Sequence, residues 1–211
     1  MANFNPFEKY IDRELDEFVK NRSYDLETIM YKTGILYENK LDLDLFNGVG
    51  VASLNWDPFI GSTPDSIKRY QREFCWELED KQSLIESIYQ KIDCGKILIR
   101  LRSYKEIQEL ISNGIKDGLA FNDIVDGKQR LNAIYEFYYN GFRDKHGYLF
   151  SEYSSTIQNM FMKTEPFSYS VLIENSPDRL VLKQFLRMNT AGKPQSIEHL
   201  DKVRSFTSNK E

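Results

Sequence analysis

The segment DIVDGKQRLNAIYEF, residues 123–137, constrains the fold most, because a short apolar run passes directly into a helical pattern. The run around NDIV predicts a strand that ends at Gly127. Apolar residues then recur at helical spacing: Leu131, Ile134, Tyr135, Tyr138 and Phe142. This junction predicts a chain that mixes helices and strands.

The rest of the chain repeats this mixture. Helical patterns cover residues 5–21, 23–34, 80–95, 103–114, 151–163 and 176–192, and strand patterns cover KILIRL and FSYSVLI. Residues 47–65 hold three glycines and two prolines, which predicts a mobile loop with one short strand. We therefore expect an α/β (α+β) fold, with a small mixed sheet flanked by helices.

The composition limits the number of domains and the kind of ligand. A chain of 211 residues with 41% hydrophobic and 14% aromatic content can bury one large core. We expect a helical lead-in over residues 1–46, the main domain over 47–205, and a frayed or truncated tail over 206–211. The net charge of −4 argues against coating nucleic acid through bulk positive charge, so any anion site must be local.

Metal centres of cysteine and histidine, and membrane insertion, receive little support. Cys75 and Cys94 lie far apart, and His146 and His199 form no metal-binding pair, so we expect the histidines to be ordinary surface or loop residues. The chain has no run long enough to span a membrane and no signal-peptide layout at its start. A cytoplasmic protein with reduced thiols is expected.

The polar residues at the junction suit a phosphate. A strand that ends at Gly127 and starts a helix leaves the first N–H groups of that helix unpaired, and these groups attract an anion. Lys128 and Arg130 add positive charge, and Arg can bind a phosphate through two parallel hydrogen bonds. The alternative is structural: Asp126 caps the helix, and Gln129 completes a capping box without any ligand.

Two other segments favour the functional interpretation. RYQREFCWELED carries a second Gln-Arg pair before Trp76, and FLRMNTAGKPQS carries an Arg and an Asn at the end of a helix. In this order the three segments resemble the GmrSD-type family of restriction and phage-defence proteins, over residues 23–205. The matching residues are Tyr70, Gln71, Arg72 and Trp76, then Asp126, Gly127, Lys128, Gln129 and Arg130, then Phe185, Arg187, Asn189 and Gly192.

The resemblance implies a ParB/sulfiredoxin-like domain that binds or hydrolyses a nucleoside triphosphate and controls cleavage of foreign DNA. It also implies DNA and a nuclease domain or partner chain as partners. Lys128 departs from the family's DGQQR motif by replacing its first Gln with a cation, which suits phosphate binding and alters any role in positioning water. The family's nuclease domain is absent from these 211 residues, and no nuclease activity is expected of this chain alone.

Phosphoryl transfer needs charge neutralisation and positioning, which assigns roles to the matched residues. The main-chain N–H groups of Gly127, Lys128 and Gln129 would face a phosphate, and Arg130 would clamp it. Asp126 would hold Mg²⁺ or orient water, with Asn189 as a second oxygen ligand. The predicted catalytic residues are Asp126, Gln129 and Arg130, and the predicted phosphate-binding residues are Tyr70, Gln71, Arg72, Gly127, Lys128 and Arg187.

Several of these residues have ordinary structural alternatives. Trp76 and Phe74 suit packing in a core or cleft wall, and Tyr70 suits either role. Arg187 could pair with a carboxylate, and Asn189 could terminate a helix. The competing function is a non-catalytic module that uses the same arginines to bind DNA backbone phosphates or a partner.

Overall fold

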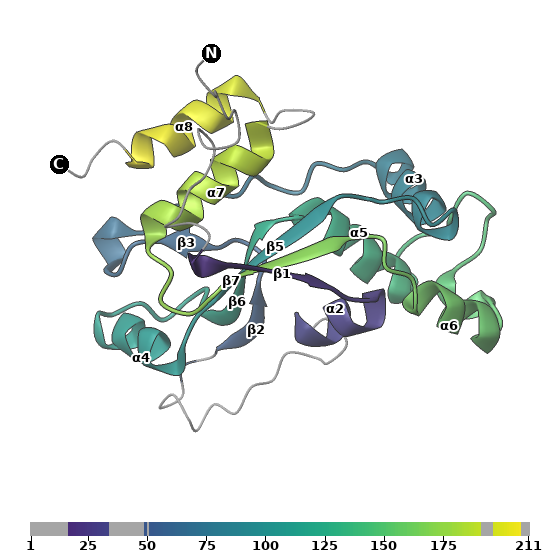
Figure 1. Ribbon diagram of the computed structural model, residues 1–211, viewed down its shortest axis with the longest axis horizontal. Coiled ribbons are helices and arrows are strands. Elements are labelled where there is room, and N and C mark those ends of the chain that lie inside the picture. The colour runs from purple at the N-terminus through teal and green to yellow at the C-terminus, as the bar shows by residue number, and fades with distance from the viewer. Residues whose placement is uncertain (1–16, 34–48, 50, 191–195, 208–211) are drawn as a thin grey trace, which may run out of the picture.

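A five-stranded mixed sheet forms the centre of the computed structural model, which describes residues 17–33, 49, 51–190 and 196–207 (Figure 1). The strand order is β1-β7-β5-β6-β2. The bounds are β1 Val19–Ser23, β7 Ser168–Leu172, β5 Lys96–Leu101, β6 Ala120–Asp126 and β2 Ala52–Asn55. β7 and β5 run parallel, as do β6 and β2, whereas the β1–β7 and β5–β6 pairs are antiparallel. β3 (Phe59–Ile60) and β4 (Lys68–Arg69) form a separate antiparallel pair.

Helices cover both faces of the sheet (Figure 1). One apolar core contains residues of α2 (Leu26–Lys32), α3 (Leu78–Tyr89), α5 (Lys128–Tyr138) and α6 (Ser155–Met162). The opposite core contains residues of α7 (Asp178–Thr190) and α8 (Ile197–Thr207). Strand β5 serves both, because Ile97 and Ile99 face the first core and Leu98 faces the second.

The remaining helices lie at the edges of this arrangement. α4 (Tyr104–Ser112) packs in a third apolar cluster with residues such as Val51 and Phe59. Two 3₁₀ helices, η3 (Pro64–Ser66) and η4 (Phe150–Glu152), lie in the connections. None of the helices within the described residues has the length and apolar character that spanning a membrane requires.

The structure confirms the expected fold class and most of the predicted elements. KILIRL is β5, FSYSVLI contains β7, and NDIV lies inside β6. The helix predicted over residues 103–114 is α4, and Ser103 caps it by accepting a hydrogen bond from Glu106 N at 3.1 Å. The predicted second helix is α2, where Asp25 accepts from Thr28 N at 2.8 Å.

Two sequence predictions are wrong. The helical pattern over residues 5–21 ends in a strand, because β1 pairs with β7 along Val19–Ser23. The loop expected at 47–65 with one short strand contains two, β2 and β3, because β2 pairs in parallel with β6 and β3 pairs with β4. Residues 1–16 and 34–46 of the predicted lead-in, like 208–211 of the predicted tail, lie outside the described residues, and 206–207 belong to α8.

Candidate functional site

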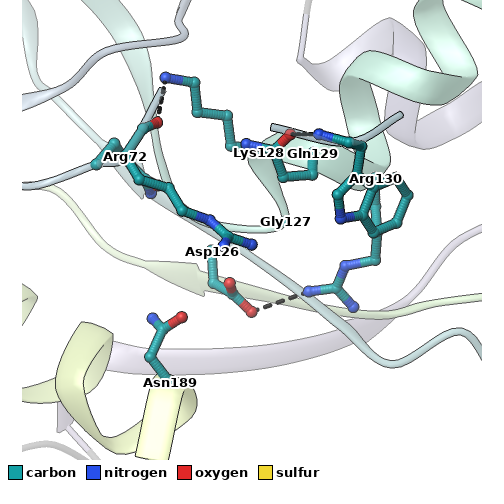
Figure 2. A pocket seen from close by; sticks show the side chains of 9 residues that line it. Arg72, Asp126, Gly127, Lys128, Gln129, Arg130 and Asn189 are labelled. Atoms are coloured by element: carbon teal, nitrogen blue, oxygen red, sulfur yellow. Dashed lines mark hydrogen bonds and ion pairs between the residues drawn. The ribbon is translucent and has the colours of Figure 1, made fainter. Parts of the chain in front are cut away.

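A polar pocket of about 110 Å³ opens where β6 ends and α5 begins (Figure 2). All three motif segments meet there, from the stretch after β4, from the β6–α5 junction and from α7. The lining residues are Gln71, Arg72, Trp76, Asp126, Gly127, Lys128, Gln129, Arg130 and Asn189. The structure therefore brings together residues that the sequence separates by more than a hundred positions.

Gly127 makes the junction possible. It adopts a left-handed conformation with φ of 99°, and a Cβ atom at this position would lie 2.4 Å from Ile97 Cδ1. The first intrahelical hydrogen bond joins Leu131 N to Gly127 O at 2.9 Å. The N–H groups of the first turn thus precede the hydrogen-bonded part of α5 and lie beside the pocket. The alternative in which Asp126 caps the helix is wrong, because the capping residue is Gly127.

Arg130 anchors α5 to the start of β5 and to the residues just before it. Its Nη1 donates to Cys94 O at 2.8 Å, and its Nη2 donates to Lys96 O at 2.6 Å. Nη2 also donates to the Asp126 carboxylate at 2.9 Å. The guanidinium lines the pocket but is already bound to three acceptors, which gives it a structural role beside the predicted clamping role.

The side chains of Gln129 and Lys128 hold the segment that follows Arg72. The Gln129 carbonyl oxygen accepts hydrogen bonds from Cys75 N at 3.0 Å and Trp76 N at 3.3 Å, and its amide donates to Glu73 O at 2.9 Å. Lys128 Nζ donates to Arg72 O at 2.8 Å, as Figure 2 shows.

Both residues are buried, and burial lowers the pKa of Lys128. The Lys128 ammonium also lies over the exposed Phe74 ring, 4.5 Å from its centroid. Its partners therefore lie on the chain segment that forms one wall of the pocket.

Tyr70 and Gln71 position the same wall. Gln71 donates to Ile124 O at 2.9 Å and to Val125 O at 2.8 Å, which ties the segment to β6. The Tyr70 ring is buried against Phe185, with centroids 5.3 Å apart, and is not among the pocket residues. His199 Nε2 lies 2.9 Å from Tyr70 O. The expectation that His199 is an ordinary surface or loop residue is therefore wrong: it lies in α8, and no sequence pattern indicated this contact.

Arg72 is the cation whose guanidinium points across the pocket toward Asp126 (Figure 2). Within the described part of the chain, its half-buried side chain has no hydrogen bond or ion pair. Burial raises the pKa of Asp126, while the charges of Arg130 and Arg72 oppose that rise. Three cationic side chains and one carboxylate therefore line the pocket.

Of the two predicted site residues in α7, one lines the pocket and the other does not. Asn189 lines the pocket and donates through Nδ2 to Phe185 O at 2.8 Å. Arg187 is exposed and is not among the lining residues. Trp76 is half-buried and packs against the apolar core while lining the pocket, as expected of a cleft wall.

The protein groups suited to a hard metal are few. Among the described residues, no three His, Cys, Asp or Glu side chains form a group that could hold a metal ion. Asp126 and Asn189 both line the pocket and offer side-chain oxygens. Two protein oxygens fit a magnesium ion whose other ligands are nucleotide phosphates and water.

Fold and site together define an α+β domain with an arginine-lined polar pocket at a strand–helix junction. The family model described as the GmrSD restriction endonuclease, N-terminal domain, matches residues 58–207, which is most of the chain. The chain belongs to this family, as its motifs predicted. The matched region runs from β3 to α8 and includes every lining residue of the pocket.

Searches of curated proteins and of solved structures return no match. The finer expectation of a ParB/sulfiredoxin-like fold therefore stays a prediction.

Proposed function

We propose that this domain binds the phosphates of a nucleoside triphosphate, together with Mg²⁺, as a regulatory domain of a restriction-type protein. The observation that carries the proposal is Arg72, a guanidinium in a polar pocket without a hydrogen bond or ion pair to the described residues. A guanidinium can donate two parallel hydrogen bonds to a phosphate. Arg72 would make this contact opposite the first turn of α5.

The size and charge of the pocket support phosphate as the bound group. Ligand pockets for drug-sized molecules measure roughly 300–1,000 Å³, whereas this pocket measures about 110 Å³. It suits a phosphate group, with the nucleoside extending outside. Lys128 and Arg130 add positive charge around it, and the N–H groups of the first helical turn favour an anion.

We infer binding rather than rapid turnover. The Gln129 carbonyl oxygen already accepts two hydrogen bonds from the segment 73–76, and its amide donates one to the same segment, so this oxygen does not accept a proton from an attacking water. When bound, Mg²⁺ would neutralise phosphate charge, with Asp126 and Asn189 as its protein ligands. We also expect no cleavage of plain plasmid DNA by this chain, given the lack of a metal-binding carboxylate or histidine cluster among the described residues.

Calorimetric titration with ATP, GTP and CTP, with and without Mg²⁺, tests the proposal. Arg72→Ala should weaken nucleotide binding by more than tenfold, since a hydrogen bond to a charged group contributes about 1.5–3 kcal/mol. Arg69→Ala is the matched control, because Arg69 is exposed, pairs with Asp57 at 3.1 Å and is not a pocket residue. If no nucleotide binds the unsubstituted protein at near-millimolar concentration, the proposal is wrong.

A duplex DNA titration separates the competing function. If DNA binds, no nucleotide does, and Arg72→Ala abolishes the DNA signal, the pocket serves backbone phosphates instead.

A further inference from the structure

A second polar group lies inside the fold and takes no part in the pocket. Arg102, at the end of β5, donates through Nε to Asp123 Oδ2 at 2.7 Å and through Nη1 to Glu106 Oε1 at 2.8 Å. Arg100 donates to the same Glu106 oxygen at 2.8 Å and forms an ion pair with Asp178 at 3.1 Å. We call these five side chains the buried ion cluster. It joins β5, β6, α4 and α7.

Five polar atoms in and beside the cluster are fully buried and have no hydrogen-bond partner within the described residues. They are the Tyr70 hydroxyl, Arg100 Nε and Nη1, Glu106 Oε2 and Asp123 Oδ1, and of these Arg100 Nη1 has the ion pair with Asp178. Buried polar groups in native proteins nearly always have a partner, which is either protein or ordered water. A buried donor or acceptor without a partner keeps the full cost of its removal from water.

Tyr70 and Asp123 are both buried on the same side of the sheet. Asp123 alternates along β6 with Ile124 and so faces the same side as Val125, which belongs to the apolar cluster that contains Tyr70. Tyr70 and Asp123 are 1% and 0% exposed. Burial raises the pKa of Tyr70, and the charge of Asp123 adds to that rise.

The chemistry of the unpaired atoms selects water over an ion. The set offers three donor atoms, one in Tyr70 and two in Arg100, and two carboxylate acceptors, in Glu106 and Asp123. A cation would lie beside two guanidinium groups, and an anion would lie beside the carboxylates. Water both donates and accepts, and a buried water typically makes two to four hydrogen bonds.

We propose that an internal water molecule bridges the Tyr70 hydroxyl and Asp123 Oδ1, accepting from the first and donating to the second. This water would complete the buried ion cluster and attach Tyr70 to the sheet. Tyr70 directly precedes Gln71 and Arg72, so the water-mediated contact would hold in place the start of the segment that forms one wall of the pocket. The inference stands without any ligand in the pocket.

A high-resolution crystal structure of the intact protein tests this directly. The expected result is an ordered water within about 2.7–3.2 Å of both oxygens. A direct hydrogen bond between Tyr70 and Asp123, an ion at this position, or the absence of any density would each overturn the proposal.

Tyr70→Phe provides a second test. The change in stability that it causes differs between a hydroxyl that binds water and a hydroxyl that has no partner. If the hydroxyl binds water, its removal should raise the unfolded-to-folded ratio by roughly fivefold to thirtyfold. If the hydroxyl has no partner, its removal should leave stability unchanged or improve it. Tyr169→Phe is the matched control, since Tyr169 is equally buried but lies in the opposite core. An unchanged or more stable Tyr70→Phe protein would overturn the proposal.

Discussion

Strand β6 supplies the aspartates of two aspartate–arginine ion pairs, and the two pairs differ in how far they are buried. Asp123 pairs with Arg102 at 2.7 Å, and the two side chains are 0% and 3% exposed. Three residues later, Asp126 pairs with Arg130 at 2.9 Å, and these side chains are 23% and 18% exposed. The same chemistry therefore occurs once inside the protein and once at its surface.

The two pairs differ in whether a further cation lies beside them. Arg102 directs its donors to Asp123, Glu106 and the Phe59 carbonyl, so every nitrogen of the inner guanidinium has an acceptor. The outer pair adjoins Arg72, which brings a further cation without a described hydrogen bond or ion pair. We expect the inner pair to serve stability, and the outer pair, which lies beside a further cation, to serve the proposed ligand binding. Substitutions at the two pairs should therefore separate stability from binding.

Arg102→Ala should have the largest effect, a loss of about 3–5 kcal/mol in the free energy of unfolding, because it leaves Asp123 buried without its partner. Urea unfolding followed by circular dichroism measures this loss. Arg69→Ala, at an exposed pair with Asp57, should cost no more than about 1 kcal/mol. Equal losses in the two variants would mean that burial does not distinguish these pairs.

Arg130→Ala should cost about 2–3 kcal/mol of stability, since its guanidinium holds two backbone carbonyls and Asp126. It should also weaken nucleotide binding. Arg72→Ala, by contrast, should change stability by less than about 0.5 kcal/mol while it removes binding. Unfolding and calorimetry on both variants measure this separation. A destabilised Arg72→Ala protein with normal nucleotide affinity would contradict the comparison.

Local patterns predicted much of the fold and the meeting of the three motifs. β5, the β6–α5 junction and α4 follow from periodicity, glycine and capping, which act over a few residues. Arg72, Asp126 and Asn189 were chosen from sequence motifs, and the structure places all three at one pocket. The family resemblance, rather than propensity, carried that long-range information.

Partners of individual side chains could not be predicted, because they depend on tertiary contacts. Gln129 was expected to act on a ligand, but its amide binds the segment 73–76. Glu106 lies in the first turn of α4, and no local pattern predicts that its carboxylate binds two arginines. β1 was missed for the same reason, since its polar sequence becomes a strand only by pairing with β7, far along the chain.

Asp126→Asn should produce the smallest effect, a threefold to tenfold tightening of sulfate binding in the absence of metal, or about 1 kcal/mol. The carboxylate repels an anion in the pocket and occupies Arg130 Nη2. Asparagine keeps the shape and removes the charge. Mg²⁺-dependent nucleotide binding should weaken in the same variant, because a metal ligand is lost. Calorimetry with sulfate, and then with Mg²⁺ and nucleotide, measures both changes.

The pH dependence of sulfate binding tests the same charge without a substitution. Burial raises the pKa of Asp126 above its usual value, and the charges of Arg130 and Arg72 oppose this rise. The folded protein thus binds this proton at a higher pH than the unfolded chain does. At a pH above the raised pKa the ionised carboxylate destabilises the fold, and this destabilisation is lost as the pH falls through the raised pKa. Sulfate keeps its charge over this range and should bind more tightly as Asp126 becomes neutral. Asp126→Asn should lose this dependence; if it keeps the wild-type pH profile, another group titrates and the outer pair does not control the pocket.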